Sequence, residues 1–211
     1  MRISRRASGI AAGIALTVGA TAFAAPSAQA APKLGNKSLA AVLTADKSGF
    51  DSNRDDFDIV TAAVLAVLKA KPNSKVKVLA DGTHPVTAFV PNDAAFRRLA
   101  YDLNGKKVVR AEKDVFAKVA SLGIPTVEAV LLYHVVPGAT IDSKAALKAN
   151  NVSLKSALGL PIKVRVVGKN IYLQDRDTNS TNPKVVVADI NKGNKQIAHG
   201  IDRVLRPADL P

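Results

Sequence analysis

The chain of 211 residues contains no cysteine, no tryptophan and a single methionine, and aromatic residues make up only 4% of it. Without cysteine the protein has no disulfides, no thiolate metal site and no cysteine nucleophile. Any chemistry must therefore come from oxygen atoms, from the three histidines or from the backbone. Acidic residues are also few, because 17 Asp and Glu stand against 30 Lys and Arg and leave a formal net charge of +13. Such a surplus attracts anionic partners.

Apolar residues, in contrast, are plentiful, at 47% of the chain. This fraction, over this length, suits one packed domain and excludes a disordered tail or a collagen-like rod. Helical spacing of apolar residues predicts a buried helix over 57–68. Capping residues and prolines predict further helices over 92–101, 111–122, 126–135 and 143–150.

The first thirty residues have the pattern of a secretory signal peptide of bacterial style. Three arginines precede an acid-free, Ala-rich run over 9–25, and small residues flank Gln29. We expect cleavage before Ala31, a flexible N-terminus over 31–37 and a folded domain over 38–211. The remaining chain keeps a net charge of +10 and has no second apolar run long enough to span a bilayer. We therefore expect a secreted, extracellular protein without stable membrane insertion, exported by the general or the twin-arginine route.

Strand patterns concentrate in the last third of the chain. Apolar and basic residues alternate over 162–166, and a two-residue turn leads into a second strand at 171–173. The three valines at 185–187 predict a strand buried on both faces, and residues 197–205 predict a closing strand. Earlier in the chain, 76–79 and 87–91 are expected to form a short strand pair. Helices mostly first and strands mostly last predict an α+β domain.

No familiar catalytic motif occurs in the chain: it has no Gly-x-Ser-x-Gly elbow, His-Glu-x-x-His pair, phosphate-binding glycine loop or dinucleotide fingerprint. His84, His134 and His199 could meet a hydroxyl and a carboxylate in space. Without a flanking signature we predict no catalytic residues and no cofactor. For His134, between two apolar neighbours, we predict a core imidazole that is hydrogen-bonded to the backbone.

Two oxygen-rich stretches, 51–55 and 175–179, place Asp and Asn at alternate positions, as a calcium-binding loop does. Both lack the central glycine and the closing glutamate of such a loop. Turn formation by Asp and Asn explains them more simply, so we predict no metal site.

Basic side chains cluster on either side of residue 104. The candidates for binding a polyanion are Arg97, Arg98, Lys106, Lys107, Arg110 and Lys113. The alternative is a solvated face that keeps a secreted protein soluble. Nucleic acid is not expected, because no aromatic stacking platform accompanies these charges. Cell-wall anions or acidic glycans fit an exported basic protein better.

Three segments in order resemble the signatures of the fasciclin domain. They are Thr87–Phe96 with the sequence TAFVPNDAAF, Leu131–Gly138 with LLYHVVPG, and Ile197–Leu205 with IAHGIDRVL. The resemblance extends over about residues 38–208. It implies a single α+β domain of two short sheets in a wedge with surrounding helices. It also implies a secreted, non-enzymatic module of cell adhesion or matrix interaction, with a cell-surface or cell-wall component as its partner.

The resemblance further implies roles for individual residues. A Tyr-His segment and an Asp-Ile pair are implicated in receptor binding in animal members, and the matching positions are Tyr133, His134, Asp189 and Ile190. The motif residues that we expect to shape the scaffold are Thr87, Phe89, Pro91, Phe96, Pro137, Gly138, His199 and Asp202. Among them, the phenylalanines would anchor the core and the Asp202 carboxylate would accept hydrogen bonds and hold the closing strand.

Two other functions compete with the binding module. An apolar pocket between helices and sheet could carry a small apolar ligand, and a hydrolase could be built on His134 or His199, which we rank last. Asn36, Asn151 and Asn179 fit the pattern of glycosylation acceptors. Neither the ligand nor the oligomeric state follows from the sequence.

Overall fold

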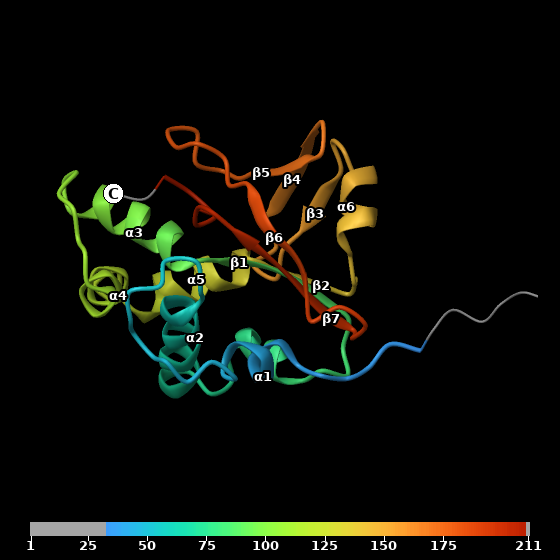
Figure 1. Ribbon diagram of the computed structural model, residues 1–211, viewed down its shortest axis with the longest axis horizontal. Coiled ribbons are helices and arrows are strands. Elements are labelled where there is room, and N and C mark those ends of the chain that lie inside the picture. The colour runs from blue at the N-terminus through green and yellow to red at the C-terminus, as the bar shows by residue number, and fades with distance from the viewer. Residues whose placement is uncertain (1–32, 210–211) are drawn as a thin grey trace, which may run out of the picture. The chain divides into compact units, whose positions relative to one another are not determined.

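The computed structural model describes residues 33–209 (Figure 1), so the expected signal peptide lies outside the described residues. The helices are α1 (Leu39–Leu43), α2 (Asp58–Ala70), the 3₁₀ helix η1 (Lys75–Ala80), α3 (Asp93–Leu103), α4 (Glu112–Ala120), α5 (Ile124–Tyr133) and α6 (Ser143–Lys148). The strands are β1 (Val86–Pro91), β2 (Val135–Pro137), β3 (Ser153–Lys155), β4 (Pro161–Val167), β5 (Asn170–Gln174), β6 (Val185–Ile190) and β7 (Gln196–Ile201).

Two sheets organise the fold. One has the strand order β2-β1-β7-β6, in which β1 and β7 run parallel and the other neighbours run antiparallel. The other is an antiparallel sheet of order β3-β4-β5. All residues of β1 and β7 are buried. These two strands therefore lie at the centre of the domain. The two small sheets, together with the helices, confirm the predicted α+β class.

Strand β1 separates two hydrophobic cores because alternate side chains of a strand point to opposite faces. Ala88 and Val90 pack with the helices, among them α2 through Val60 and Val64. Phe89 points the other way, into a second core formed mainly by β4 and β5. Figure 1 shows helices α2 to α5 gathered apart from β3, β4, β5 and α6, with β1 and β7 running between them.

The predicted helices are present, within a few residues at each end. The Asn92 side chain caps α3 by accepting a hydrogen bond from the Ala95 N–H at 2.9 Å. Pro125 lies in the first turn of α5, where its missing N–H costs nothing. In the described part of the chain no single helix is long and apolar enough to cross a bilayer. Among these helices, only the pair α4 and α5 has the required length and apolarity when the two are taken together, and a bend of 103° separates them.

The predicted strand over 76–79 is wrong. Residues Lys75–Ala80 form η1, and β1 pairs with β2 and β7 instead. Val76 and Leu79 are its buried residues, and their spacing of three matches one turn of a 3₁₀ helix. The Ser74 hydroxyl accepts the Val76 N–H at 3.2 Å and favours the helical start.

The prediction that residues 185–187 are buried on both faces is also wrong. They belong to β6, which is one of the two edge strands of its sheet, and Val186 and Val187 are 48% and 41% exposed. The pairing of β6 with β7 is interrupted by register shifts, which are common at sheet edges. The closing strand is shorter than predicted, because β7 ends at Ile201.

The folded part reaches further toward the N-terminus than the predicted boundary at residue 38. The Gly35 N–H donates to the Gly193 carbonyl at 2.8 Å, and the Gly35 carbonyl accepts from the Lys195 N–H at 2.9 Å. The Lys37 N–H adds a hydrogen bond to the Asn194 side chain at 3.0 Å. These contacts tie the predicted flexible segment, from Gly35 onward, to the turn between β6 and β7.

Candidate functional site

A groove of about 590 Å³ lies along α3 and the loop that connects it to α4. Five arginines line it: Arg54, Arg97, Arg98, Arg110 and Arg203. We call this site the arginine groove. Tyr101 adds an aromatic ring that is 39% exposed, and Asp102 is the one carboxylate among the lining residues. The groove thus concentrates five positive charges of a basic protein in one hollow.

Two of the five arginines hold the walls of the groove together. Arg97 donates to the Arg110 carbonyl and forms an ion pair of 3.0 Å with Glu112, whose side chain is fully buried. Arg98 donates to the Asp202 carbonyl and so joins α3 to the segment after β7. Because these guanidinium groups are already engaged, we assign them a positioning role.

The other three arginines come from three separate segments. Arg54 lies in the loop before α2, which is fixed to α3 by a hydrogen bond of 2.8 Å from the Ala94 N–H to the Arg54 carbonyl. Arg110 precedes α4 and Arg203 follows β7. Within residues 33–209, the guanidinium groups of these three arginines form no hydrogen bond or ion pair. They are the charges that an anion could engage.

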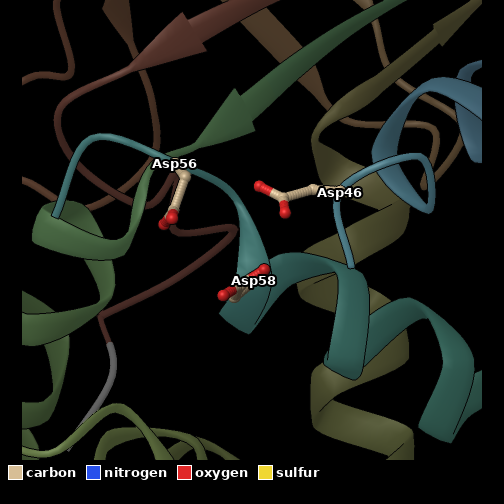
Figure 2. A group of neighbouring side chains, drawn as sticks. All are labelled: Asp46, Asp56 and Asp58. Carbon is tan, nitrogen blue, oxygen red and sulfur yellow. The ribbon is translucent and has the colours of Figure 1, made fainter. Parts of the chain in front are cut away.

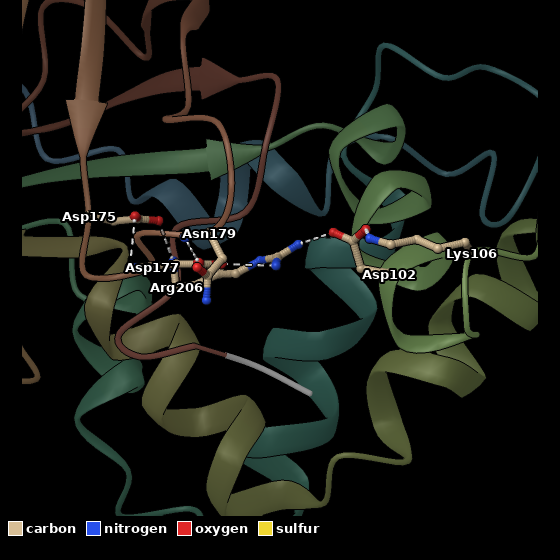
Figure 3. Close-up of polar contacts among 6 residues, drawn as sticks. All are labelled: Asp102, Lys106, Asp175, Asp177, Asn179 and Arg206. Carbon is tan, nitrogen blue, oxygen red and sulfur yellow. Dashed lines mark hydrogen bonds and ion pairs between the residues drawn. The ribbon is translucent and has the colours of Figure 1, made fainter.

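Asp102 reduces the positive charge of the groove only in part, because cations flank it on both sides (Figure 3). It forms ion pairs with Lys106 and, at 2.6 Å, with Arg206. Burial alone would raise the pKa of Asp102, but the hydrogen bonds from Lys106 and Arg206 hold it below its ordinary value. Arg206 also bonds Asp177 at 3.0 Å, so this network anchors the C-terminal segment to α3.

The polyanion candidates predicted from the sequence divide into two groups in the structure. Arg97, Arg98 and Arg110 line the arginine groove, whereas Lys106, Lys107 and Lys113 are exposed beside it and do not line it. Sequence reasoning missed Arg54 and Arg203. Both are distant from the cluster in the chain, and no local charge pattern distinguishes them.

Both members of the Tyr-His segment are buried. Tyr133 is 0% exposed and its hydroxyl donates to the Pro161 carbonyl at 2.8 Å. His134 is 4% exposed; its Nδ1 donates to the Val130 carbonyl at 2.7 Å, and its Nε2 accepts the Leu205 N–H at 2.9 Å. Burial lowers the pKa of His134 to about 4. A partner could contact these side chains only if the fold opened, whereas the hydrogen bonds match the predicted core imidazole.

The Asp-Ile pair ends β6 and is half-buried. The Asp189 carboxylate accepts hydrogen bonds from the N–H and hydroxyl of Ser143 at 2.7 and 2.8 Å, and from Lys192 at 2.7 Å. Burial opposes the charge, but these donors lower the pKa of Asp189 to about 2. Ile190 packs against the helix core. Asp189 thus fixes the start of α6 to the sheet edge.

His199 lies next to this pair without forming a catalytic triad. Its Nδ1 accepts the backbone N–H of Asp189 at 3.3 Å, and its Nε2 donates to the Ile141 carbonyl at 2.8 Å. The imidazole therefore bonds only backbone groups, and the Ser143 hydroxyl bonds a carboxylate without a base.

Among the described residues, neither His134 nor His199 bonds a hydroxyl. His84 lies in an exposed turn, where its Nδ1 is 3.2 Å from the Thr83 hydroxyl and 2.9 Å from the Asp81 carboxylate. That hydroxyl donates to Asp81 at 2.6 Å, and both groups lie at the same ring nitrogen, whereas a catalytic triad uses both nitrogens of the imidazole.

The remaining motif residues build the scaffold. Phe89 and Phe96 are 4% and 3% exposed in the two cores, and Pro91 is the last residue of β1. The Thr87 hydroxyl donates to the Ala139 carbonyl and accepts the Ile141 N–H, both at 2.9 Å, which closes the turn at Pro137–Gly138. Asp202 accepts the Lys184 N–H at 2.8 Å through its carboxylate and so ties the end of β7 to the start of β6.

Comparison with known proteins agrees with this architecture. The sequence profile of the Fasciclin domain matches residues 60–207. No curated protein matches the chain. A solved structure of a FAS1 domain pair from the insect cell adhesion molecule Fasciclin I is similar, with a TM-score of 0.56 and 16% sequence identity, over 82% of this chain and 51% of that one. The chain thus spans about half the length of that solved chain.

Proposed function

This chain belongs to the fasciclin domain family, and on that premise we propose that it is a secreted, non-enzymatic binding module that attaches to an anionic polymer of a cell surface or cell wall. Fasciclin domains are generally adhesion-related extracellular modules. The observation that supports the anionic partner is the arginine groove, in which three guanidinium groups from separate segments have no partner among the described residues.

Arginine suits this task because its planar guanidinium forms two parallel hydrogen bonds with a phosphate, sulfate or carboxylate group. Neighbouring arginines repel each other when the groove is empty, and an anion relieves this repulsion. The net charge of +10 that remains after the expected cleavage before Ala31 adds long-range attraction. Exposed charges are screened beyond about 8 Å at physiological ionic strength, so binding should weaken as salt rises.

Retention on a column of sulfated polysaccharide tests the proposal. The double variant R110Q and R203Q removes two positive charges from the groove and should bind about tenfold more weakly. The matched control is K144Q and K148Q, which removes two charges from α6, away from α3 in Figure 1. The control should elute close to the wild type. Equal losses for both variants would show that net charge alone drives binding, and salt-independent retention would refute the electrostatic mechanism.

A second candidate function is the carriage of a small apolar ligand, and a different groove favours it. The two apolar pockets inside the described domain hold only about 10 Å³ each, room for one water at most. A surface groove of about 930 Å³ lies between η1 and the turn after β3, with Val78, Pro137 and Leu158 in its lining. Three lysines also line it: Lys75, Lys77 and Lys155.

Such a mixed lining suits an amphiphile with an acidic head. Mass spectrometry of the natively purified protein tests this function, because a carrier retains its ligand. A bound amphiphile that is lost in the variant L158D would support the carrier. A protein that is free of ligand, and that takes up no added fatty acid, would exclude it.

A further inference from the structure

Carboxylates gather on the helix side of this basic protein, between the loop that follows α1 and the first turns of α2 and α3. Three overlapping groups each bring three carboxylate oxygens within 4.8 Å of one another. Their members are Asp46, Asp51, Asp56, Asp58, Asp93 and Glu112. Figure 2 shows Asp46, Asp56 and Asp58 directing their carboxylates toward a common space. Arg97 pairs with Glu112, and no other basic side chain within residues 33–209 is in an ion pair with the six.

Several of these oxygens are buried and receive no hydrogen bond from an N–H or hydroxyl group of the described residues. Within residues 33–209, both carboxylate oxygens of Asp56, and Oδ2 of Asp58 and of Asp93, are inaccessible to solvent and receive no hydrogen bond from an N–H or hydroxyl group. Burial, and a hydrogen bond shared with Asp56, raise the pKa of Asp93 to about 8, so these two carboxyl groups partner each other. Asp58 is 8% exposed and Asp93 is 0% exposed. A buried carboxylate without a partner costs several kcal/mol in general, and the neutral form or a cation relieves that cost. Asp58 Oδ2, which has no donor among the described residues and no carboxyl partner, is therefore independent support for a ligand at this cluster.

Not all six carboxylates are available to a ligand. Glu112 is already occupied, because Oε1 pairs with Arg97 at 3.0 Å and Oε2 accepts the Asp51 N–H at 2.7 Å. Asp93 uses Oδ1 to accept the Ile59 N–H at 3.0 Å, which caps α2. Asp46 accepts from the Ser48 N–H and hydroxyl through Oδ1 alone. The hydrogen bond with Asp93 uses one oxygen of Asp56. Asp46, Asp56 and Asp58 thus each keep a free oxygen, and the three carboxylates bring oxygens within 4.8 Å of one another.

We propose that Asp46, Asp56 and Asp58 bind one Ca²⁺ ion, which joins the loop after α1 to the first turn of α2. The oxygen separations, up to 4.8 Å, match opposite ligands on Ca²⁺, whose Ca–O distances are about 2.3–2.6 Å. Asp46 is exposed, so water can complete the coordination. The oxygen-rich stretch that imitates a calcium loop is not the site, because Asp51 and Asn53 use side-chain oxygens to accept the N–H two residues on.

Calorimetric titration of the purified protein with CaCl₂ at neutral pH tests the proposal. We expect one ion per chain, with a dissociation constant on the order of 10⁻⁴–10⁻³ M, as in extracellular calcium modules. The melting temperature should rise with CaCl₂ and not with NaCl of equal ionic strength. Absence of a binding heat together with an unchanged melting temperature would overturn the proposal and leave a shared proton as the occupant.

Variants separate a specific site from general charge effects. Asp56→Asn should weaken Ca²⁺ binding at least tenfold and should melt in chelator at or above the wild-type temperature, because it removes a buried charge. The matched control is Asp55→Asn, whose exposed carboxylate belongs to none of the three groups. Should Asp56→Asn fail to fold, Asp46→Asn at an exposed position replaces it. Equal loss of Ca²⁺ binding in the control would refute the assignment.

Discussion

Acidification should destabilise this protein through His134. The folded pKa of His134 is about 4, against an ordinary value of 6.5, because the side chain is fully buried. Between these values the unfolded chain binds a proton that the folded chain does not. Stability from this group is therefore complete above pH 6.5 and is lost as the pH falls toward 4. At 1.36 kcal/mol per pKa unit, the loss amounts to about 3 kcal/mol.

The assay is urea unfolding of the wild type and of His134→Gln at several pH values between 7.5 and 4. Glutamine retains one donor and one acceptor for the Val130 carbonyl and the Leu205 N–H, but it does not titrate. Carboxylates such as Asp175, whose pKa burial raises to about 6, act in both proteins and cancel in the difference. The stability advantage of the wild type should shrink by about 3 kcal/mol across this range.

A control variant and a clear negative outcome complete the test. Val130→Ala removes a buried neighbour on α5 without any titratable group, so its cost should be the same at each pH. If the difference between the wild type and His134→Gln is also constant with pH, His134 titrates equally in the folded and unfolded chains. The argument from burial would then be wrong.

Three substitutions should test other contacts of the scaffold. Asp202→Ala leaves the Lys184 N–H without its acceptor and should lower the free energy of unfolding by about 1–3 kcal/mol, and an unchanged melting temperature would contradict this role. The Gln196 amide bonds the Leu39 N–H and the carbonyls of Val78 and Asp81, and Gln196→Leu would leave all three backbone groups without a partner. A urea titration should therefore show that the free energy of unfolding falls by about 3 kcal/mol or more. Gly82→Ala would place its Cβ 1.8 Å from the Asn36 carbonyl oxygen, so amide exchange in the segment before α1 should accelerate, and unchanged exchange would argue against this packing.

Local patterns predicted the helices well because the interactions that define a helix are local. Apolar spacing of three and four residues marked α2, and Asn92 and Pro125 marked the starts of α3 and α5. Short apolar runs were harder to interpret. Residues 76–79 are apolar at three of four positions, a run that suits a short strand as well as a 3₁₀ turn. The strand prediction failed because β1 has other partners.

The burial of a strand depends on its place in a sheet. The valines of β6 have the composition of an inner strand, but β6 pairs on one side only and exposes Val186 and Val187. The burial of Tyr133 and His134 likewise depends on contacts with a segment that is distant in the chain. The two residues end α5 against the segment that follows β7, about seventy positions away in the chain, as the hydrogen bond from the Leu205 N–H to His134 shows.

By itself, the sequence determined the fold class, the family and the positive charge, since composition, periodicity and three ordered motifs are properties of neighbouring residues. Only the tertiary structure decided where charges converge. Arg54 and Arg203 reach the arginine groove, and Asp46 reaches Asp56 and Asp58, through the docking of loops onto α2 and α3. The amino-acid composition sets the net charge. A binding site, however, needs charges at fixed separations, and the packing of distant segments sets those separations.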